Sequence, residues 1–282
     1  MNRLFLYILA VLFSAISFAS ENPQNIEPHS IYSSALEEQR DYFVYLPPSY
    51  RDSEQKFPVL YVLDGDIHRW KSISGVVEGL STETLEQQIQ QAIVVSIPNT
   101  DRERDLTPSK VHEWTFKGKV LDTFKQSGNA NEFLKFLVQE LIPHINDVYN
   151  TNNDRVLVGE SFGGLFASYA LMHHPSSFSS YLIIDPTSIW DNNYLNRQFE
   201  ELSFENSKPS AKVFFAFANN SKLGDIGITN KQWGQIFASK LESMNSEEFS
   251  VKQQYFDGET HGTVAFLGWY HGLKFLLANT EE

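Results

Sequence analysis

The sequence contains no cysteine, and this absence excludes several kinds of chemistry at once. Disulfide bonds, thiolate metal sites and a cysteine nucleophile are all ruled out. Basic residues are also scarce, because 22 Lys and Arg stand against 35 Asp and Glu and the formal charge is -13. A nucleic-acid-binding face must be basic, and the Lys and Arg residues form no cluster here. We therefore expect no nucleic-acid partner.

The N-terminus carries a short, uncharged and mainly apolar run. Residues 4–19 carry no charge, follow Arg3 and end with Ser17 and Ala19, small residues at the positions that a signal peptidase reads. The run is shorter than the roughly 20 apolar residues that a membrane span needs. We expect residues 1–19 to be a signal peptide that is cleaved during export to a periplasm or to the medium, with no stable membrane insertion afterwards. An uncleaved N-terminal anchor is the alternative.

The remaining residues, 20–282, have the pattern of one α/β domain. Apolar segments rich in β-branched residues alternate with segments of helical period. The expected strands are residues 41–46, 57–63, 91–97, 156–158, 181–184, 212–218 and 249–256, and the expected helices are residues 132–149, 165–173, 231–244 and 264–277. This alternation predicts a mostly parallel, twisted central sheet with helices on both faces. Residues 99–128 lack a clear period and are expected to form a loop or cap over the strand ends.

The most informative motif is Gly-Glu-Ser-Phe-Gly at residues 159–163. A predicted strand leads into it and a predicted helix follows, which is the context of the G-x-S-x-G nucleophile elbow of α/β-hydrolases. The turn places the Ser161 hydroxyl at the carboxyl edge of the sheet, where open α/β folds bind ligands. We therefore expect Ser161 to be a nucleophile. A glycine-rich turn with a structural serine is the alternative.

A serine nucleophile needs a base to take its proton. Among eight histidines, His261 lies after the last predicted strand and before the last predicted helix. An α/β-hydrolase carries its base in that loop, and the order serine then histidine fits. A metal-binding role is the weaker reading, because no second histidine or carboxylate stands beside His261 at ligand spacing. Nothing in the chain suggests a cofactor.

Three alternatives stay open for the acid that would orient His261. An α/β-hydrolase usually has this acid after the strand at residues 212–218, but Asn219 and Asn220 stand there. Asp225 follows shortly afterwards and is the preferred candidate. Asp185, at the end of the preceding strand, is the second candidate. The third alternative is a serine–histidine pair steadied by a backbone carbonyl or by water.

Two backbone N–H groups are expected to stabilise the oxyanion of the tetrahedral intermediate. One belongs to Phe162, directly after the nucleophile. The other belongs to Asp66, in the turn Gly65-Asp66 that follows the strand at residues 57–63.

Several segments together resemble the Putative esterase family, which includes esterase D, enterobactin-type siderophore esterases and mycolyltransferases. They are residues 45–48 (YLPP), 57–65 (FPVLYVLDG), 159–164 (GESFGG), 185–191 (DPTSIWD) and 259–264 (ETHGTV), and the resemblance spans about residues 30–278. It implies an α/β-hydrolase fold and cleavage of carboxylic esters through Ser161 and His261. Residues 97–108 (IPNTDRERDLTP) resemble the siderophore-esterase branch. The acid stays open, because Asn219 and Asn220 stand where esterase D has aspartate.

The expected function is that of a serine esterase acting on a small-molecule ester, with a siderophore-type ester as one candidate. The alternatives are an acyltransferase or thioesterase of the same family, and a catalytically silent relative that only binds. No coiled-coil pattern indicates an oligomer. Arg102 and Arg104 are candidates for holding an anionic substrate group, but ion pairs with Asp101 or Asp105 are the simpler expectation.

Overall fold

The computed structural model describes residues 28–82, 86–206 and 209–278. The predicted signal peptide lies outside these residues. Within the described ranges, no helix combines the length and the apolar character needed to cross a membrane.

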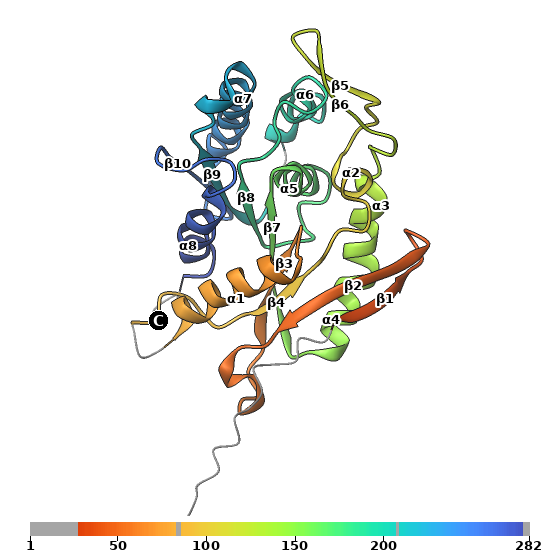
Figure 1. The fold of residues 1–282 in the computed structure, drawn as a ribbon. Helices are drawn as coiled ribbons and strands as arrows, with labels where there is room; N and C mark the ends of the chain where they lie inside the picture. Colours follow the sequence, from red (N-terminus) through yellow and green to blue (C-terminus); the bar gives the residue numbers. More distant parts are fainter. Residues whose placement is uncertain (1–27, 83–85, 207–208, 279–282) are drawn as a thin grey trace, which may run out of the picture.

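A central sheet of eight strands runs through the molecule in the order β1-β2-β4-β3-β7-β8-β9-β10 (Figure 1). Neighbouring strands from β4 to β10 are parallel, whereas β2 pairs antiparallel with both β1 and β4. The predicted α/β class is confirmed, and β1 adds to the seven predicted strands. The strands are β1 (His29–Ser33), β2 (Glu38–Tyr45), β3 (Phe57–Val62), β4 (Ile93–Ser96), β7 (Thr151–Glu160), β8 (Ser180–Ile184), β9 (Ala211–Ala218) and β10 (Phe249–Phe256).

Helices cover both faces of this sheet, as predicted (Figure 1). The core residues of α1 and α8 pack on one face, and those of α3 to α7 pack on the other. A π-helical segment, η3 (Phe136–Leu141), joins α3 to α4 within the predicted helix at residues 132–149. The helices are α1 (Ile67–Ser81), α2 (Arg102–Leu106), α3 (Ala130–Lys135), α4 (Ile142–Val148), α5 (Phe162–His173), α6 (Tyr194–Glu201), α7 (Asp225–Glu242) and α8 (Val264–Leu276).

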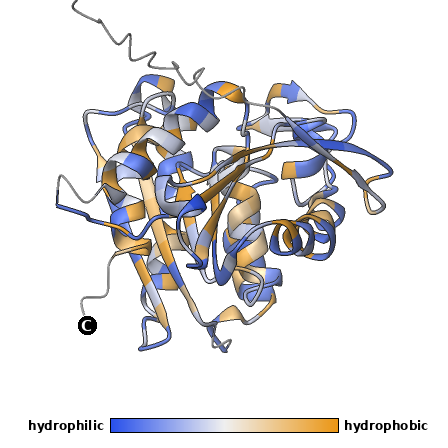
Figure 2. Cartoon of the chain, turned by 90° about the horizontal axis from the view of Figure 1, so that it is seen from below, coloured by the Kyte–Doolittle hydropathy of each residue, from blue (hydrophilic) through white to orange (hydrophobic). Residues whose placement is uncertain are grey.

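Strand β3 shows how the two layers hold the middle of the sheet. Val59 and Tyr61 contribute to the core on the α5 side, and Leu60 and Val62 contribute to the core on the α1 and α8 side. Successive side chains of a strand point to opposite faces, so a strand covered on both sides is apolar throughout. Figure 2 shows the central strands in hydrophobic colours accordingly. This double packing fixes the strand ends that carry the site.

Residues 99–128 form the expected cap and contain more regular structure than a loop. They hold α2 and a separate antiparallel hairpin, β5 (Glu113–Phe116) with β6 (Lys119–Thr123). Two aromatic rings of this segment, Trp114 and Phe124, lie with their centroids 5.3 to 6.0 Å from those of Phe162 and Trp190. The cap therefore packs against the beginning of α5, directly beside Ser161.

Candidate active site

Ser161 sits in the tight turn between β7 and α5. Its backbone has φ 58° and ψ -117°, a conformation that non-glycine residues rarely adopt and that often marks a functional site. A Cβ atom on Gly159 would lie 2.1 Å from the carbonyl oxygen of Gly163, so only glycine allows the strand and the helix to approach this closely. The local geometry is that of the predicted nucleophile elbow.

The other expected site residues follow neighbouring parallel strands. Asp66 comes shortly after β3, Asp185 directly after β8, and His261 in the loop after β10. Because parallel strands end at the same edge of a sheet, segments far apart in the chain meet here. The residues that meet around Ser161 therefore come from four different strand ends.

His261 is held by Asp185. Its Nδ1 atom lies 2.5 Å from Oδ2 of Asp185, whose side chain is fully buried. The same carboxylate accepts hydrogen bonds from the Asn220 side-chain amide at 2.8 Å and from the backbone N–H of Ala218 at 3.3 Å. Asn220, at the position where the acid usually stands, thus contacts the carboxylate that faces His261.

The expectation that Asp225 orients His261 is wrong. Asp225 lies in the first turn of α7, its side chain is 71% exposed, and Oδ2 is 2.7 Å from Nζ of Lys117 in the β5–β6 hairpin. A carboxylate in the first turn is favoured by the helix dipole and needs no role in the site. The alternative of a serine–histidine pair without an acid does not fit either, because Asp185 contacts the ring.

The surroundings of His261 favour its protonated form. The hydrogen bond that the ring donates to Asp185 is the largest influence and raises the pKa of His261 above its ordinary value of 6.5. Burial of the ring and the nearby Arg102 act in the opposite direction, whereas the charge of Glu160 raises the pKa further. An imidazole in this environment is well suited to accept a proton and to hold it as imidazolium.

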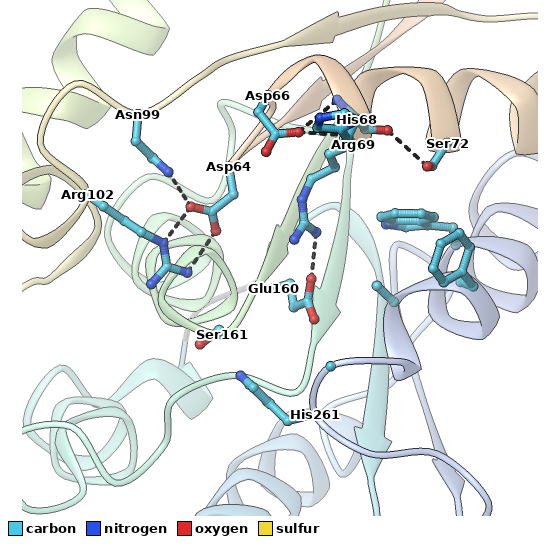
Figure 3. A pocket seen from close by; sticks show the side chains of 14 residues that line it. Asp64, Asp66, His68, Arg69, Ser72, Asn99, Arg102, Glu160, Ser161 and His261 are labelled. Atoms are coloured by element: carbon cyan, nitrogen blue, oxygen red, sulfur yellow. Dashed lines mark hydrogen bonds and ion pairs between the residues drawn. The ribbon is translucent and has the colours of Figure 1, made fainter.

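The Ser161 hydroxyl lies close to the hydroxyl of Thr187. Its Oγ atom lies 3.3 Å from Oγ1 of Thr187. Figure 3 shows the His261 ring directed toward Ser161, although no hydrogen bond joins the two side chains within the described part of the chain. Contacts between nucleophile and base often tighten only when substrate binds.

The two expected oxyanion donors differ in whether their N–H group already donates to another acceptor. Phe162 opens α5, and the first N–H groups of a helix have no intrahelical acceptor. The N–H of Asp66 donates to the carbonyl oxygen of Asp64 at 3.0 Å, within its own turn. The Asp66 carboxylate caps α1 by accepting from the N–H groups of His68 and Arg69, both at 2.9 Å. The role of Asp66 therefore stays a prediction.

Ser161 and His261 line an open, strongly charged cleft of about 630 Å³ (Figure 3). Arg102 forms a two-pronged ion pair with Asp64, with Nε and Nη2 at 2.6 and 2.9 Å from the carboxylate oxygens. The other titratable side chains in its wall are Asp66, His68, Arg69 and Glu160. The cleft therefore places cationic and anionic groups around the serine.

Two of the ion pairs in the cleft wall were not expected from the sequence. Arg69 pairs with Glu160 at 2.6 Å, and no sequence signal identifies this contact between α1 and the residue before the nucleophile. Arg104 pairs with Asp105 at 2.7 Å as expected, whereas Arg102 reaches Asp64 rather than Asp101.

A second pocket, of about 150 Å³, shares only Ser161 and His261 with the cleft. Its walls come from the β5–β6 hairpin, the segment after β8, and the region from the end of β9 into α7. Its wall residues include Trp114, Thr187, Ile189, Asn220, Leu223 and Ile226.

Known proteins include relatives of this chain. Residues 33–262 match the model of the family described as Putative esterase. A siderophore enterobactin esterase of Emericella nidulans is 36% identical over 220 residues, which cover 69% of this chain and 72% of that protein. The ferri-bacillibactin esterase BesA of Bacillus subtilis is 24% identical over 196 residues, which cover 62% of this chain and 65% of that protein.

A solved structure shows the same fold. The crystal structure of an IroE-like serine hydrolase from Shewanella oneidensis superposes with a TM-score of 0.82 and 32% sequence identity, covering 89% of this chain and 80% of that one.

Proposed function

Because the chain belongs to the Putative esterase family, we propose that it hydrolyses a carboxylic ester through an acyl-enzyme on Ser161, with His261 as general base and Asp185 as the orienting acid. One observation carries this assignment of roles. The buried Asp185 lies 2.5 Å from Nδ1 of His261, at the same sheet edge as a serine in a nucleophile elbow. A nucleophile, a base and a residue that orients the base are thus close together.

In the acylation half of this proposal, Ser161 Oγ attacks the ester carbon while Nε2 of His261 takes the hydroxyl proton. The N–H of Phe162, aided by the turn at Asp66, stabilises the resulting oxyanion. His261 then gives its proton to the alkoxy oxygen, the carbon–oxygen bond breaks, and the alcohol leaves. The acyl group stays bound to Ser161.

Deacylation repeats these steps with water as the nucleophile. His261 takes a proton from water, the hydroxide attacks the acyl carbon, and the proton returns to Ser161 Oγ as the acid product leaves. Asp185 holds the ring so that Nε2 faces the serine. The products are one carboxylic acid and one alcohol.

We further propose that the ester is of the siderophore type. Two relatives are named as esterases of such compounds, and residues 97–108 supply Asn99 and Arg102 to the cleft wall. A volume of about 630 Å³ is within the usual range for small-molecule sites. Arg69 and Arg102 each use only part of their five N–H donors on carboxylates of the wall, so both retain donors for an oxygen-rich ligand.

A fluorophosphonate probe tests the catalytic proposal. We expect covalent labelling of the wild-type protein at Ser161, because phosphonylation requires an activated serine hydroxyl. Mass spectrometry of the labelled peptide locates the adduct. Ser161→Ala is the matched control and should stay unlabelled. An unlabelled wild-type protein would instead support the alternative of a silent, binding-only relative.

We also propose that the protein is exported, and this proposal depends on the N-terminal sequence alone. Cleavage after Ala19 should yield a mature protein that begins at Ser20. The mass of the protein isolated from the periplasm or medium measures this directly. A full-length protein retained with the membranes would point to the uncleaved anchor.

A further inference from the structure

The two cavities that meet at Ser161 and His261 differ in size and in chemistry. We propose that the smaller one, named here the acyl pocket (Trp114, Thr187, Ile189, Asn220, Leu223 and Ile226), binds the acyl group of the ester, and that the alcohol leaves through the charged cleft. This inference rests on the proposed ester hydrolysis and adds the class of acyl group that the site accepts.

The volume of the acyl pocket indicates the size of the group that fills it. At about 150 Å³ it is as large as an engineered protein cavity that binds benzene. It therefore accommodates one six-membered ring or a chain of about six carbon atoms. A larger acyl group would extend beyond the pocket.

The walls favour an uncharged occupant. Trp114, Ile189, Leu223 and Ile226 supply apolar surface, and His261 is the one titratable side chain among the residues that line the pocket. Trp114 is held by rings of the cap and of the segment after β8, with its centroid 5.9 Å from Phe124 and 5.7 Å from Trp190. A flat wall that is fixed in this way suits a ring.

Asn220 is a polar residue in the wall, but its amide is engaged with the catalytic edge. It is 4% exposed, and its amide nitrogen donates to Asp185. This bond fixes the orientation of the amide, so Asn220 links the wall of the acyl pocket to the carboxylate that faces His261.

The two-step chemistry decides which half of the ester belongs in which cavity. The acyl group stays on Ser161 after the alcohol has left, and water must then reach the ester carbon. The cleft is open and lined with charged groups, so it gives the alcohol a way out and water a way in. The acyl pocket is small and apolar, and it suits the half of the substrate that stays.

Hydrolysis of p-nitrophenyl esters with acetyl, hexanoyl and benzoyl groups tests the inference. Ile226 is half-buried in the wall, and Ile226→Trp should fill the pocket. We expect the ratio of kcat/KM for hexanoyl or benzoyl to that for acetyl to fall at least about tenfold, as when an apolar pocket loses room for a substrate group. Ile228→Trp is the matched control, because Ile228 lies on the same helix, is 41% exposed and lies outside the pocket lining. Its ratios should equal those of the wild type.

Three results would overturn the proposal: equal losses for all three acyl groups, the same change in Ile228→Trp, or selectivity that follows the alcohol in a series of ethyl, hexyl and benzyl acetates. If Ile226→Trp fails to fold, Ile226→Ala replaces it and should shift the preference toward longer acyl chains.

A binding measurement separates this inference from the catalytic proposal. Ser161→Ala protein should bind methyl benzoate in a calorimetric titration, and adding Ile226→Trp should weaken binding at least about tenfold. Equal binding by the two variants would reject the acyl pocket even if Ser161 is labelled by the fluorophosphonate. Loss of labelling with intact, Ile226-dependent binding would reject the catalysis and keep the pocket as a binding site.

Discussion

Ser161→Ala should lower kcat for ester hydrolysis by about 10⁶, the size measured when the nucleophile of a catalytic triad is removed. The reason is that no other hydroxyl stands in a nucleophile elbow beside His261 among the described residues. Steady-state rates and a urea unfolding curve, measured on the same preparation, check both activity and fold. We expect the free energy of unfolding to stay near the wild-type value, because only one oxygen atom is removed at the cleft surface. A variant that keeps more than a few per cent of the activity would contradict the assignment.

His261→Ala extends this prediction, because the serine and its base act as one unit. Alone it should be nearly as damaging as Ser161→Ala, and the double variant should be little worse than either single variant. Additive losses would mean that the two residues act independently and would argue against the proposed mechanism.

Asp185→Asn should lower kcat by about 10⁴, the loss seen when the aspartate of a serine-protease triad is neutralised. The change keeps the size of the side chain but removes the charge that faces Nδ1 of His261, so the ring loses its preferred tautomer. Asp225→Asn is the matched control and should stay near wild type, because Asp225 pairs with Lys117 at an exposed position. A large loss in the control with little effect at residue 185 would restore Asp225 as the acid.

The pH dependence of activity tests the role of Asp185 in a second way. Activity requires neutral His261, so kcat/KM should rise with pH as the ring loses its proton. Asp185 raises the pKa of His261, and the protonated, inactive form therefore persists to higher pH than for an ordinary histidine. The midpoint of the wild-type profile should lie above 6.5, the ordinary value, and Asp185→Asn should move it to lower pH. An unmoved midpoint would show that Asp185 does not govern this ionisation.

Elements with a strong local pattern could be predicted from the sequence. The strand predicted over residues 249–256 is β10 itself, and the buried strand at 57–63 and the helix at 264–277 agree with β3 and α8 within a residue or two at each end. Helix α1 is absent from the predicted elements, although Trp70, Ile73, Val77 and Leu80 recur at helical spacing and Asp66 caps it. Gly75 and Gly79 lower the helix propensity of this segment.

The sequence by itself determined the alternation of the main strands and helices, the elbow at Ser161 and the loop that carries His261. These features depend on residues that are neighbours in the chain, such as Gly159 and Gly163 around the turn. They follow from local conformational preference and hydrophobic pattern.

Only the tertiary structure decided which carboxylate meets His261. Asp185 and Asp225 both follow strands that end at the active edge, so the strand order admits either. The choice depends on the direction in which each short segment leaves its strand. Asp185 is buried against β9 and reaches Nδ1 of His261 across 76 positions of the chain, whereas α7 begins at Asp225 and leaves that carboxylate in solvent beside Lys117. Packing between distant segments sets these directions, and the local sequence alone does not predict that packing.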